Sequence, residues 1–247
     1  MKYKEFGDKI NPTIILLHGG GLSWWSFTDL IHLLKEDFHI VTPIIDGHGE
    51  DGETPFISIK DSAQKLIQYI DEKHKGKVFA VCGLSLGAQI VVEILSQRAD
   101  IAKYAVVESA LVVPPTGVIR FMVKSGSLFY GLIRQRWFAR IQAKALYVPE
   151  SLFDQYHRDS QNISKESLIN IFTRNTDYTA PDTLKNTKAK VLIIIDGEEV
   201  RIMDKSVRKL MSVLPHSRVC IVPGMKHGEL SLARCKEYLA LIKQFMV

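Results

Sequence analysis

The chain has 247 residues, of which 46% are hydrophobic and 24% are charged, and its formal net charge is +5. This length suits one domain, or one core with a smaller insertion, and the composition is that of a globular rather than a disordered protein. No apolar run approaches the roughly 18–20 residues that span a bilayer, and no basic run or motif accompanies the positive charge. We therefore expect neither a transmembrane segment nor a nucleic-acid partner.

The cysteines and the N-terminal residues bear on the compartment. Cys82, Cys220 and Cys235 are odd in number and do not have the spacing of metal ligands. Residues 1–5 lack the apolar stretch of a secretory signal. These observations predict a cytoplasmic protein with reduced thiols and no metal.

Short apolar runs alternate with amphipathic stretches along the chain, which indicates a parallel sheet flanked by helices. A strand is predicted at 3–6, and a turn-like segment follows it. Six further runs are apolar on both faces, as buried strands are: 13–17, 39–43, 78–82, 104–107, 191–195 and 219–222.

Amphipathic helices are predicted between these strands. Segment 58–73 places Ala63, Leu66 and Ile70 on one face. The other predicted helices lie at 88–97, 204–213 and 229–245.

One long segment interrupts the alternation. From Pro114 to Asp182 the pattern is helical, aromatic and basic, and it contains no core strand. We therefore predict an α/β core formed by residues 1–113 and 182–247. Residues 114–181 are predicted to form a helical cap over the edge where the core strands end.

The sequence Gly83-Leu84-Ser85-Leu86-Gly87 directly follows a predicted buried strand and precedes a predicted helix. In this context G-x-S-x-G is typical of a tight turn that raises the central serine oxygen above the sheet. The helix N-terminus behind the turn favours developing negative charge. Ser85 is thus the candidate nucleophile. Without that context, the same residues would indicate only a glycine-rich connection.

A histidine and three glycines, residues 18–21, follow the first buried strand. Acyl transfer needs backbone N–H donors aimed at the oxyanion, and glycines allow substrate to approach the backbone closely. We assign these two donors to Gly20 and Leu86. The alternative is that the glycines only form a turn. His18 is expected to shape the loop.

The loop at 223–228 follows the last predicted strand and contains His227. A histidine just beyond a strand end can reach over the sheet toward Ser85 and accept its proton. His227 is therefore the candidate general base. His48, in the loop at 46–49, is its rival, and for His48 we expect a structural role.

These pieces occur in the order found in the α/β-hydrolase superfamily, which the sequence resembles over nearly its whole length. The matching pieces are the His18-Gly19 loop, the loop at 46–49, the turn around Ser85 and the segment at 224–227. The resemblance is to members with a cap between the sixth and seventh core strands of the family's count. It implies a mostly parallel, doubly wound α/β sheet with a helical cap, and a Ser-His-acid triad that needs no cofactor.

The resemblance implies a triad acid after the seventh strand of that count, three residues beyond a glycine. The loop here reads DGEEV from residue 196, and the count lands on Val200, which cannot orient an imidazole. If the aspartate takes the turn position of the glycine, the acid is Glu199, which we favour over Glu198. Glu108 is a further alternative, because some relatives place the acid at the end of the preceding strand.

The leading hypothesis is hydrolysis of a carboxylic ester through an acyl-enzyme on Ser85. An acyltransferase, a peptidase, a thioesterase or a carbon–carbon bond hydrolase would use the same residues. The alternative from another class is a non-catalytic ligand-binding protein with this fold. The expected partner is a small-molecule acyl substrate of apolar or amphiphilic character. The oligomeric state is left open.

The predicted cap is basic and aromatic. Between Glu108 and Glu150 there is no acidic residue, but six cations lie there: Arg120, Lys124, Arg134, Arg136, Arg140 and Lys144. Aromatic residues suggest an apolar pocket roof, although ordinary helix packing explains most of them equally well: Trp24, Trp25, Phe121, Phe129, Tyr130, Trp137, Phe138 and Tyr147. A solvated helical face explains the charges. The functional alternatives are contact with anionic lipid and attraction of amphiphilic acyl substrates, anionic ones included, and of these we favour substrate attraction.

Overall fold

The computed structural model describes residues 1–117, 121, 130–214 and 216–246. Arg120, Lys124 and Phe129, which belong to the predicted basic and aromatic cap, lie outside the described residues.

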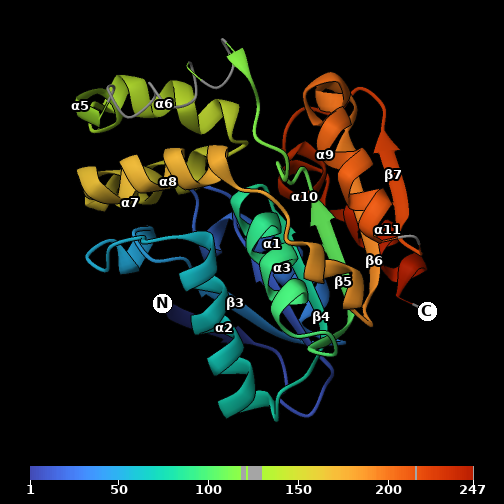
Figure 1. Cartoon of the computed structure of the whole chain (residues 1–247). Coiled ribbons are helices and arrows are strands. Elements are labelled where there is room, and N and C mark those ends of the chain that lie inside the picture. The colour runs from blue at the N-terminus through green and yellow to red at the C-terminus, as the bar shows by residue number, and fades with distance from the viewer. Residues whose placement is uncertain (118–120, 122–129, 215, 247) are drawn as a thin grey trace.

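Seven strands of the described chain form one sheet in the order β1-β3-β2-β4-β5-β6-β7 (Figure 1). β1 pairs antiparallel with β3, and every other pair of neighbours is parallel. The predicted strands are confirmed to within two residues at each end, as their bounds show: β1 (Lys2–Phe6), β2 (Thr13–Leu17), β3 (His39–Ile44), β4 (Val78–Leu84), β5 (Ala102–Glu108), β6 (Lys190–Asp196) and β7 (Arg218–Val222). The expected burial of the last strand is wrong, because β7 lies at the edge of the sheet, where Val219 and Ile221 are exposed.

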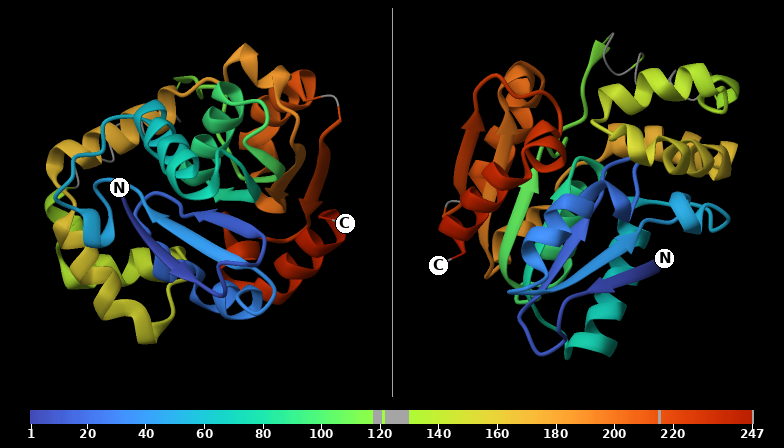
Figure 2. Two further views of the ribbon diagram at one scale, coloured as in Figure 1. Left: turned by 90° about the horizontal axis from the view of Figure 1, so that it is seen from below. Right: turned by 180° about the vertical axis from the view of Figure 1, so that it is seen from behind.

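Helices cover both faces of the sheet, as Figure 2 shows in two further views. α2 (Ile59–His74), α3 (Leu86–Gln97) and α9 (Val200–Val213) pack on one face, and α1 (Thr28–Leu34), α10 (Glu229–Ala233) and α11 (Cys235–Phe245) pack on the other. Successive residues of a strand point to opposite faces. In β2, Ile15 and Leu17 accordingly join the first cluster, whereas Ile14 and Leu16 join the second.

The segment between β5 and β6 is helical, and it is called here the inserted helices: α5 (Tyr130–Ile133), α6 (Arg136–Ala145), α7 (Phe153–Asn162) and α8 (Lys165–Asp177). In Figure 1 they lie beyond the ends of the strands, on the side to which the arrows point. The insertion follows the fifth strand of this chain, whereas the family's count places it after the sixth. The number is one lower here because only four strands precede the Ser85 turn.

Side-chain hydrogen bonds tie the inserted helices to the core. Trp25 Nε1 donates to Asp159 Oδ2 of α7 at 2.7 Å. The backbone N–H of Phe56 donates to Ser167 Oγ of α8, and the Phe56 carbonyl accepts from Asn170 Nδ2. α7 and α8 therefore have a fixed position over the loops that follow β2 and β3.

The C-terminal helix differs from the prediction of one helix over 229–245. It is interrupted at Arg234, whose backbone (φ −115°, ψ 45°) lies outside the helical region. The two shorter helices that result both face the core, because Leu230 of α10 and Ile242 of α11 are both buried.

Candidate active site

Ser85 occupies the tight turn between β4 and α3 with φ 54° and ψ −113°, a conformation that side-chain-bearing residues rarely adopt. The flanking glycines are a steric requirement of this turn. A Cβ at Gly83 would overlap the Gly87 carbonyl oxygen, and a Cβ at Gly87 would overlap that of Leu17. The G-x-S-x-G spacing thus follows from backbone segments that touch one another.

Gly20 lies beside the Ser85 turn, in the loop after β2. Leu22 N–H donates to the Gly19 carbonyl, which closes a four-residue turn in which Gly21 takes φ 78°. A Cβ built on Gly20 would lie 3.9 Å from Leu86 Cδ2. The structure therefore brings the two predicted oxyanion-hole residues, Gly20 and Leu86, into proximity.

The two buried histidines near this loop have structural contacts. His18 Nε2 accepts from Ile45 N–H at 3.1 Å, and its Nδ1 lies 2.9 Å from the Gly19 carbonyl oxygen. Burial lowers the pKa of His18 to about 3, so the ring is neutral. His48 Nδ1 contacts the Asp46 carbonyl oxygen, and burial lowers the pKa of His48 as well. Neither ring lines the cavity beside Ser85, and that of His227 does not line it either.

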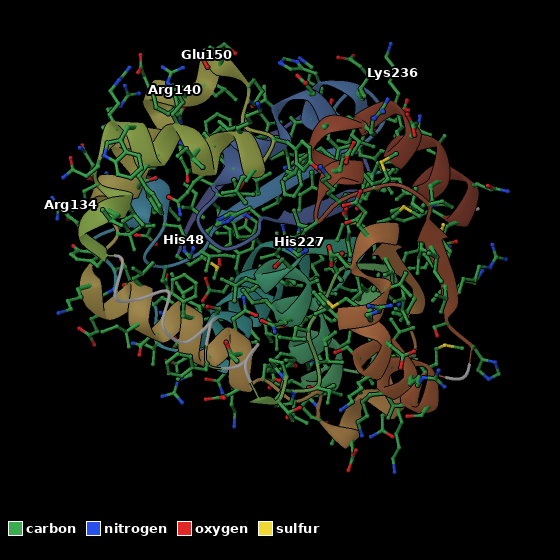
Figure 3. All side chains as sticks on the ribbon, turned by 90° about the horizontal axis from the view of Figure 1, so that it is seen from above. His48, Arg134, Arg140, Glu150, His227 and Lys236 are labelled. Carbon is green, nitrogen blue, oxygen red and sulfur yellow. The ribbon has the colours of Figure 1, made fainter. Side chains whose placement is uncertain are left out.

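His227 lies in the loop between β7 and α10 (Figure 3). Its neighbour Gly228 packs against Leu84, because a Cβ at Gly228 would lie 3.0 Å from Leu84 Cδ2. This contact places the histidine loop against the end of β4, directly before Ser85. No hydrogen bond joins Ser85 and His227 in the described part of the chain. Such bonds are often long in the absence of substrate.

Glu199 is the acid that the structure places against His227. Glu199 Oε1 lies 2.6 Å from His227 Nδ1. Residues 197–199 form a single helical turn that directs Glu199 inward, where it is 8% exposed, and leaves Glu198 exposed. Val200, on which the family's count lands, begins α9 and is exposed.

The environment of His227 favours its protonated form. Desolvation lowers the pKa of His227, but the hydrogen bond and the charge of Glu199, with the charge of Asp196, outweigh this effect and raise it. An imidazole with a carboxylate at Nδ1 is suited to accept a proton at Nε2.

Glu108, the alternative acid, is 1% exposed and accepts a hydrogen bond from Ser231 N–H at 3.3 Å. Burial, followed by the charge of Asp196, raises the pKa of Glu108 to about 8. A carboxyl group that is protonated at neutral pH cannot stabilise an imidazolium as an anion does. The structure therefore favours Glu199 over Glu108 as the partner of His227.

A cavity of about 340 Å³ lies between Ser85 and the inserted helices. Its core side is formed by Gly20, Gly21 and Ser85. The opposite side, contributed by the inserted helices and the residues next to them, is largely apolar: Ile133, Ala145, Leu146, Ile163, Leu168, Ile171 and Phe172. Its polar groups are the amides of Gln142 and Asn175 and the hydroxyls of Tyr156 and Ser160. Within the described residues no charged side chain lines this cavity.

The cations of the inserted helices do not reach the cavity. Arg136 pairs with Asp154 and Arg140 pairs with Glu150, each at 2.6 Å. Arg134 donates to Tyr130 Oη. In Figure 3, Arg134 and Arg140 lie at the periphery, away from His227. The acidic partners of these arginines, Glu150 and Asp154, thus lie just after the segment that contains no acidic residue.

The prediction of which aromatic residues line the cavity is wrong. Tyr156 and Phe172 supply the aromatic lining of the cavity. The aromatic residues singled out from the sequence, as far as they are described, do not line it: Trp24, Trp25, Phe121, Tyr130, Trp137, Phe138 and Tyr147. Phe121 and Trp137 are exposed, and Trp25 is buried against α7. Tyr156 lies in α7 and Phe172 lies in α8. The sequence does not show which face of either helix points toward Ser85.

The described residues contain neither a candidate metal site nor a membrane-spanning helix. No group of three or more His, Cys, Asp or Glu side chains is placed to hold a metal ion. None of the described helices has the length and apolar character needed to cross a membrane.

Comparison with known proteins gives a family match over most of the chain. The model described as Alpha/beta hydrolase family matches residues 14–241. An uncharacterized hydrolase of Saccharomyces cerevisiae is 49% identical over 53 residues, 22% of this chain and 18% of that protein. An uncharacterized hydrolase of Bacillus subtilis is 23% identical over 228 residues, 87% of this chain and 83% of that protein. The match to the yeast relative thus spans less than a fifth of its length.

Solved structures of similar fold cover nearly the whole chain. An enol-lactonase from Burkholderia xenovorans has a TM-score of 0.80 at 14% identity, covering 99% of this chain and 95% of that one. A structure from a study of carboxylesterases of Nitrososphaera gargenis has a TM-score of 0.79 at 17% identity, covering 99% and 93%. At these identities the similarity shows the fold.

The raised pKa of Glu108 predicts a pH-dependent stability. Between about pH 4.5, the ordinary value, and about pH 8, the folded chain keeps this proton and the unfolded chain loses it, so the free energy of unfolding falls as pH rises. Glu108→Gln should remove that fall. In urea unfolding we expect similar stabilities at pH 4.5 and a variant more stable by roughly 4 kcal/mol at pH 8. The exposed Glu198→Gln is the control, and a Glu108→Gln difference that does not grow with pH would contradict the assignment.

Proposed function

The chain belongs to the alpha/beta hydrolase family, and we propose that it hydrolyses a carboxylic ester through an acyl-enzyme formed on Ser85. The observation that carries this proposal is the 2.6 Å hydrogen bond between Glu199 and His227 in the loops next to a strained serine turn. A cavity that reaches Ser85 supplies room for an acyl group.

The reaction would begin when Ser85 Oγ attacks the ester carbonyl carbon and its proton passes to His227 Nε2. The carbonyl oxygen becomes an oxyanion, which the N–H groups of Gly20 and Leu86 would stabilise. Collapse of the tetrahedral intermediate breaks the bond to the alcohol, which leaves with the proton from His227. Water then attacks the acyl-enzyme, again giving a proton to His227, and release of the acid restores Ser85.

Glu199 would act throughout as an anion that orients the imidazole and stabilises the imidazolium. It would not receive the proton itself. Because His227 must be neutral to accept a proton, and its pKa lies above the ordinary value, kcat/KM should rise with pH through a midpoint above about 6.5.

The lining of the cavity indicates neutral substrates. A volume of about 340 Å³ lies at the lower end of the range for small-molecule sites, roughly 300–1,000 Å³. Its apolar side chains would stabilise a buried hydrocarbon acyl group, and the amides of Gln142 and Asn175 offer hydrogen bonds to a neutral polar group. A carboxylate in this cavity would be desolvated without a cationic partner among the described residues.

Ser85→Ala should abolish ester hydrolysis and leave the fold intact, because one oxygen is removed from the wall of the cavity. Turnover of p-nitrophenyl esters of graded chain length measures the activity, and the midpoint of urea unfolding measures the fold. Labelling by a fluorophosphonate should occur in the wild type and vanish in the variant. An unlabelled wild type would favour the non-catalytic ligand-binding alternative, and more than a few per cent of wild-type turnover in the variant would exclude Ser85 as nucleophile.

Glu199→Gln should lower kcat by roughly 10²–10⁴-fold, since a neutral amide cannot stabilise the imidazolium. Glu198→Gln and Glu108→Gln are the matched controls, one exposed and one buried, and each should keep kcat within about fivefold of the wild type. Steady-state kinetics on one neutral ester compares all three variants. A larger loss from Glu108→Gln would place the acid after β5 instead.

The paired cations of the inserted helices predict little role in substrate attraction. The double change Arg134→Gln and Arg136→Gln should alter kcat/KM by less than about twofold for neutral and anionic esters alike, at low and high salt. Measuring both ester classes at two ionic strengths checks this expectation. A loss confined to anionic esters that shrinks as salt is added would show that the basic segment attracts substrate.

A further inference from the structure

Asp196, the last residue of β6, is a buried carboxylate that the proposed mechanism does not use. It precedes the turn at 197–199, yet its side chain makes no capping bond there. Instead, Asp196 Oδ2 accepts the backbone N–H of Gly228 at 2.8 Å. Gly228 directly follows His227, so this bond joins the end of β6 to the histidine loop.

Ser109 provides a second connection, from the residue after β5. Its φ of 54° is one that a residue with a side chain rarely adopts, and its N–H donates to the Ile194 carbonyl of β6. Its Oγ lies 3.2 Å from Asp196 Oδ2 and 3.4 Å from Glu199 Oε1. The latter oxygen is the one that contacts His227 Nδ1. One hydroxyl proton is thus shared between two carboxylates.

This arrangement is costly to the fold. Asp196 Oδ1 and Glu199 Oε2 are buried, with no hydrogen-bond partner among the described residues. Burial, offset in part by the Gly228 bond, raises the pKa of Asp196. Buried carboxyl groups with unpaired oxygens cost stability, and local features that cost stability are found mainly at functional sites. A purely structural role for Asp196 therefore explains less than a role in the adjacent site.

We propose that Asp196 and Ser109 are positioning residues that hold His227 and Glu199 in register with the Ser85 turn. Asp196 fixes the backbone after His227, and Ser109 fixes the Glu199 carboxylate in the rotamer that meets Nδ1. The inference rests on the proposed ester hydrolysis for its catalytic consequence, but the effect on His227 can be observed without turnover.

The ionisable groups around the His227 loop come from three directions. Asp196 ends β6 and Glu199 follows it. Glu108 ends β5, and Glu229 accepts the Lys226 N–H at the start of α10. The charge of Asp196 adds to that of Glu199 in raising the pKa of His227. Removing the Asp196 charge should therefore lower that pKa, and loosening the loop should lower kcat without changing substrate binding.

The test is an NMR titration of the His227 ring, assigned with His227→Gln, together with kinetics on a neutral p-nitrophenyl ester. Asp196→Asn should lower the pKa of His227 by roughly half a unit or more. It should also reduce kcat about 10-fold or more while KM changes less than about twofold, as lost support of a site residue does elsewhere. Asp204→Asn, which removes an exposed carboxylate on α9 that pairs with Arg208, is the matched control and should change neither quantity.

Ser109→Gly is the second variant, because glycine accepts the positive φ and removes only the hydroxyl-bearing side chain. It should lower kcat several-fold at unchanged KM. If Asp196→Asn does not fold, the kcat of Ser109→Gly tests the proposal alone. A wild-type His227 pKa in folded Asp196→Asn would overturn the proposal, as would wild-type kcat in Ser109→Gly. Absence of ester turnover in the wild-type chain would instead refute the proposed function, and the titration would still test the positioning of His227.

Discussion

The hydrogen bond between Glu199 and His227 is the contact on which the site depends. It joins two loops that lie 28 residues apart in sequence, and it can form only because β6 and β7 are adjacent and parallel, with Asp196 opposite Val222. The backbone N–H of Glu198 also donates to the Met225 carbonyl, which holds the two loops together on their outer side. The pairing of β6 with β7 thus brings the loops that carry Glu199 and His227 close together.

The remaining parts are arranged around this pair by steric contact and burial. Gly83 and Gly87 let the backbone turn sharply enough to present Ser85 in a strained conformation. The inserted helices close the space above Ser85 with apolar side chains, and bonds such as that from Trp25 to Asp159 hold them there. We infer that substrate neutrality follows from this lining, since the arginines of α6 already have partners.

Much of the fold and part of the site could be predicted from the sequence. Apolar runs predict the strands, because burial on both faces leaves a clear local signal. The exposure of Val219 and Ile221 in β7 could not be predicted, because it depends on the place of that strand at the edge of the sheet. The positions of Ser85, His227 and Glu199 relative to strand ends predict that they lie near one another, and the structure places Glu199 against His227. The sequence could not predict the raised pKa of Glu108, the pairing of Arg136 with Asp154, or the place of Phe172 in the cavity wall. Each depends on which segments distant in sequence pack together, and no local pattern records that packing.

The most direct test of the central claim is the rate of Ser85 modification by a neutral fluorophosphonate as a function of pH. If His227, supported by Glu199, accepts the serine proton, the second-order rate constant should rise with pH through a midpoint above about 6.5, because the pKa of His227 is raised. In His227→Gln the rate should be low and lack this transition. A rate independent of pH in the wild type, or equal rates in the two proteins, would contradict the account.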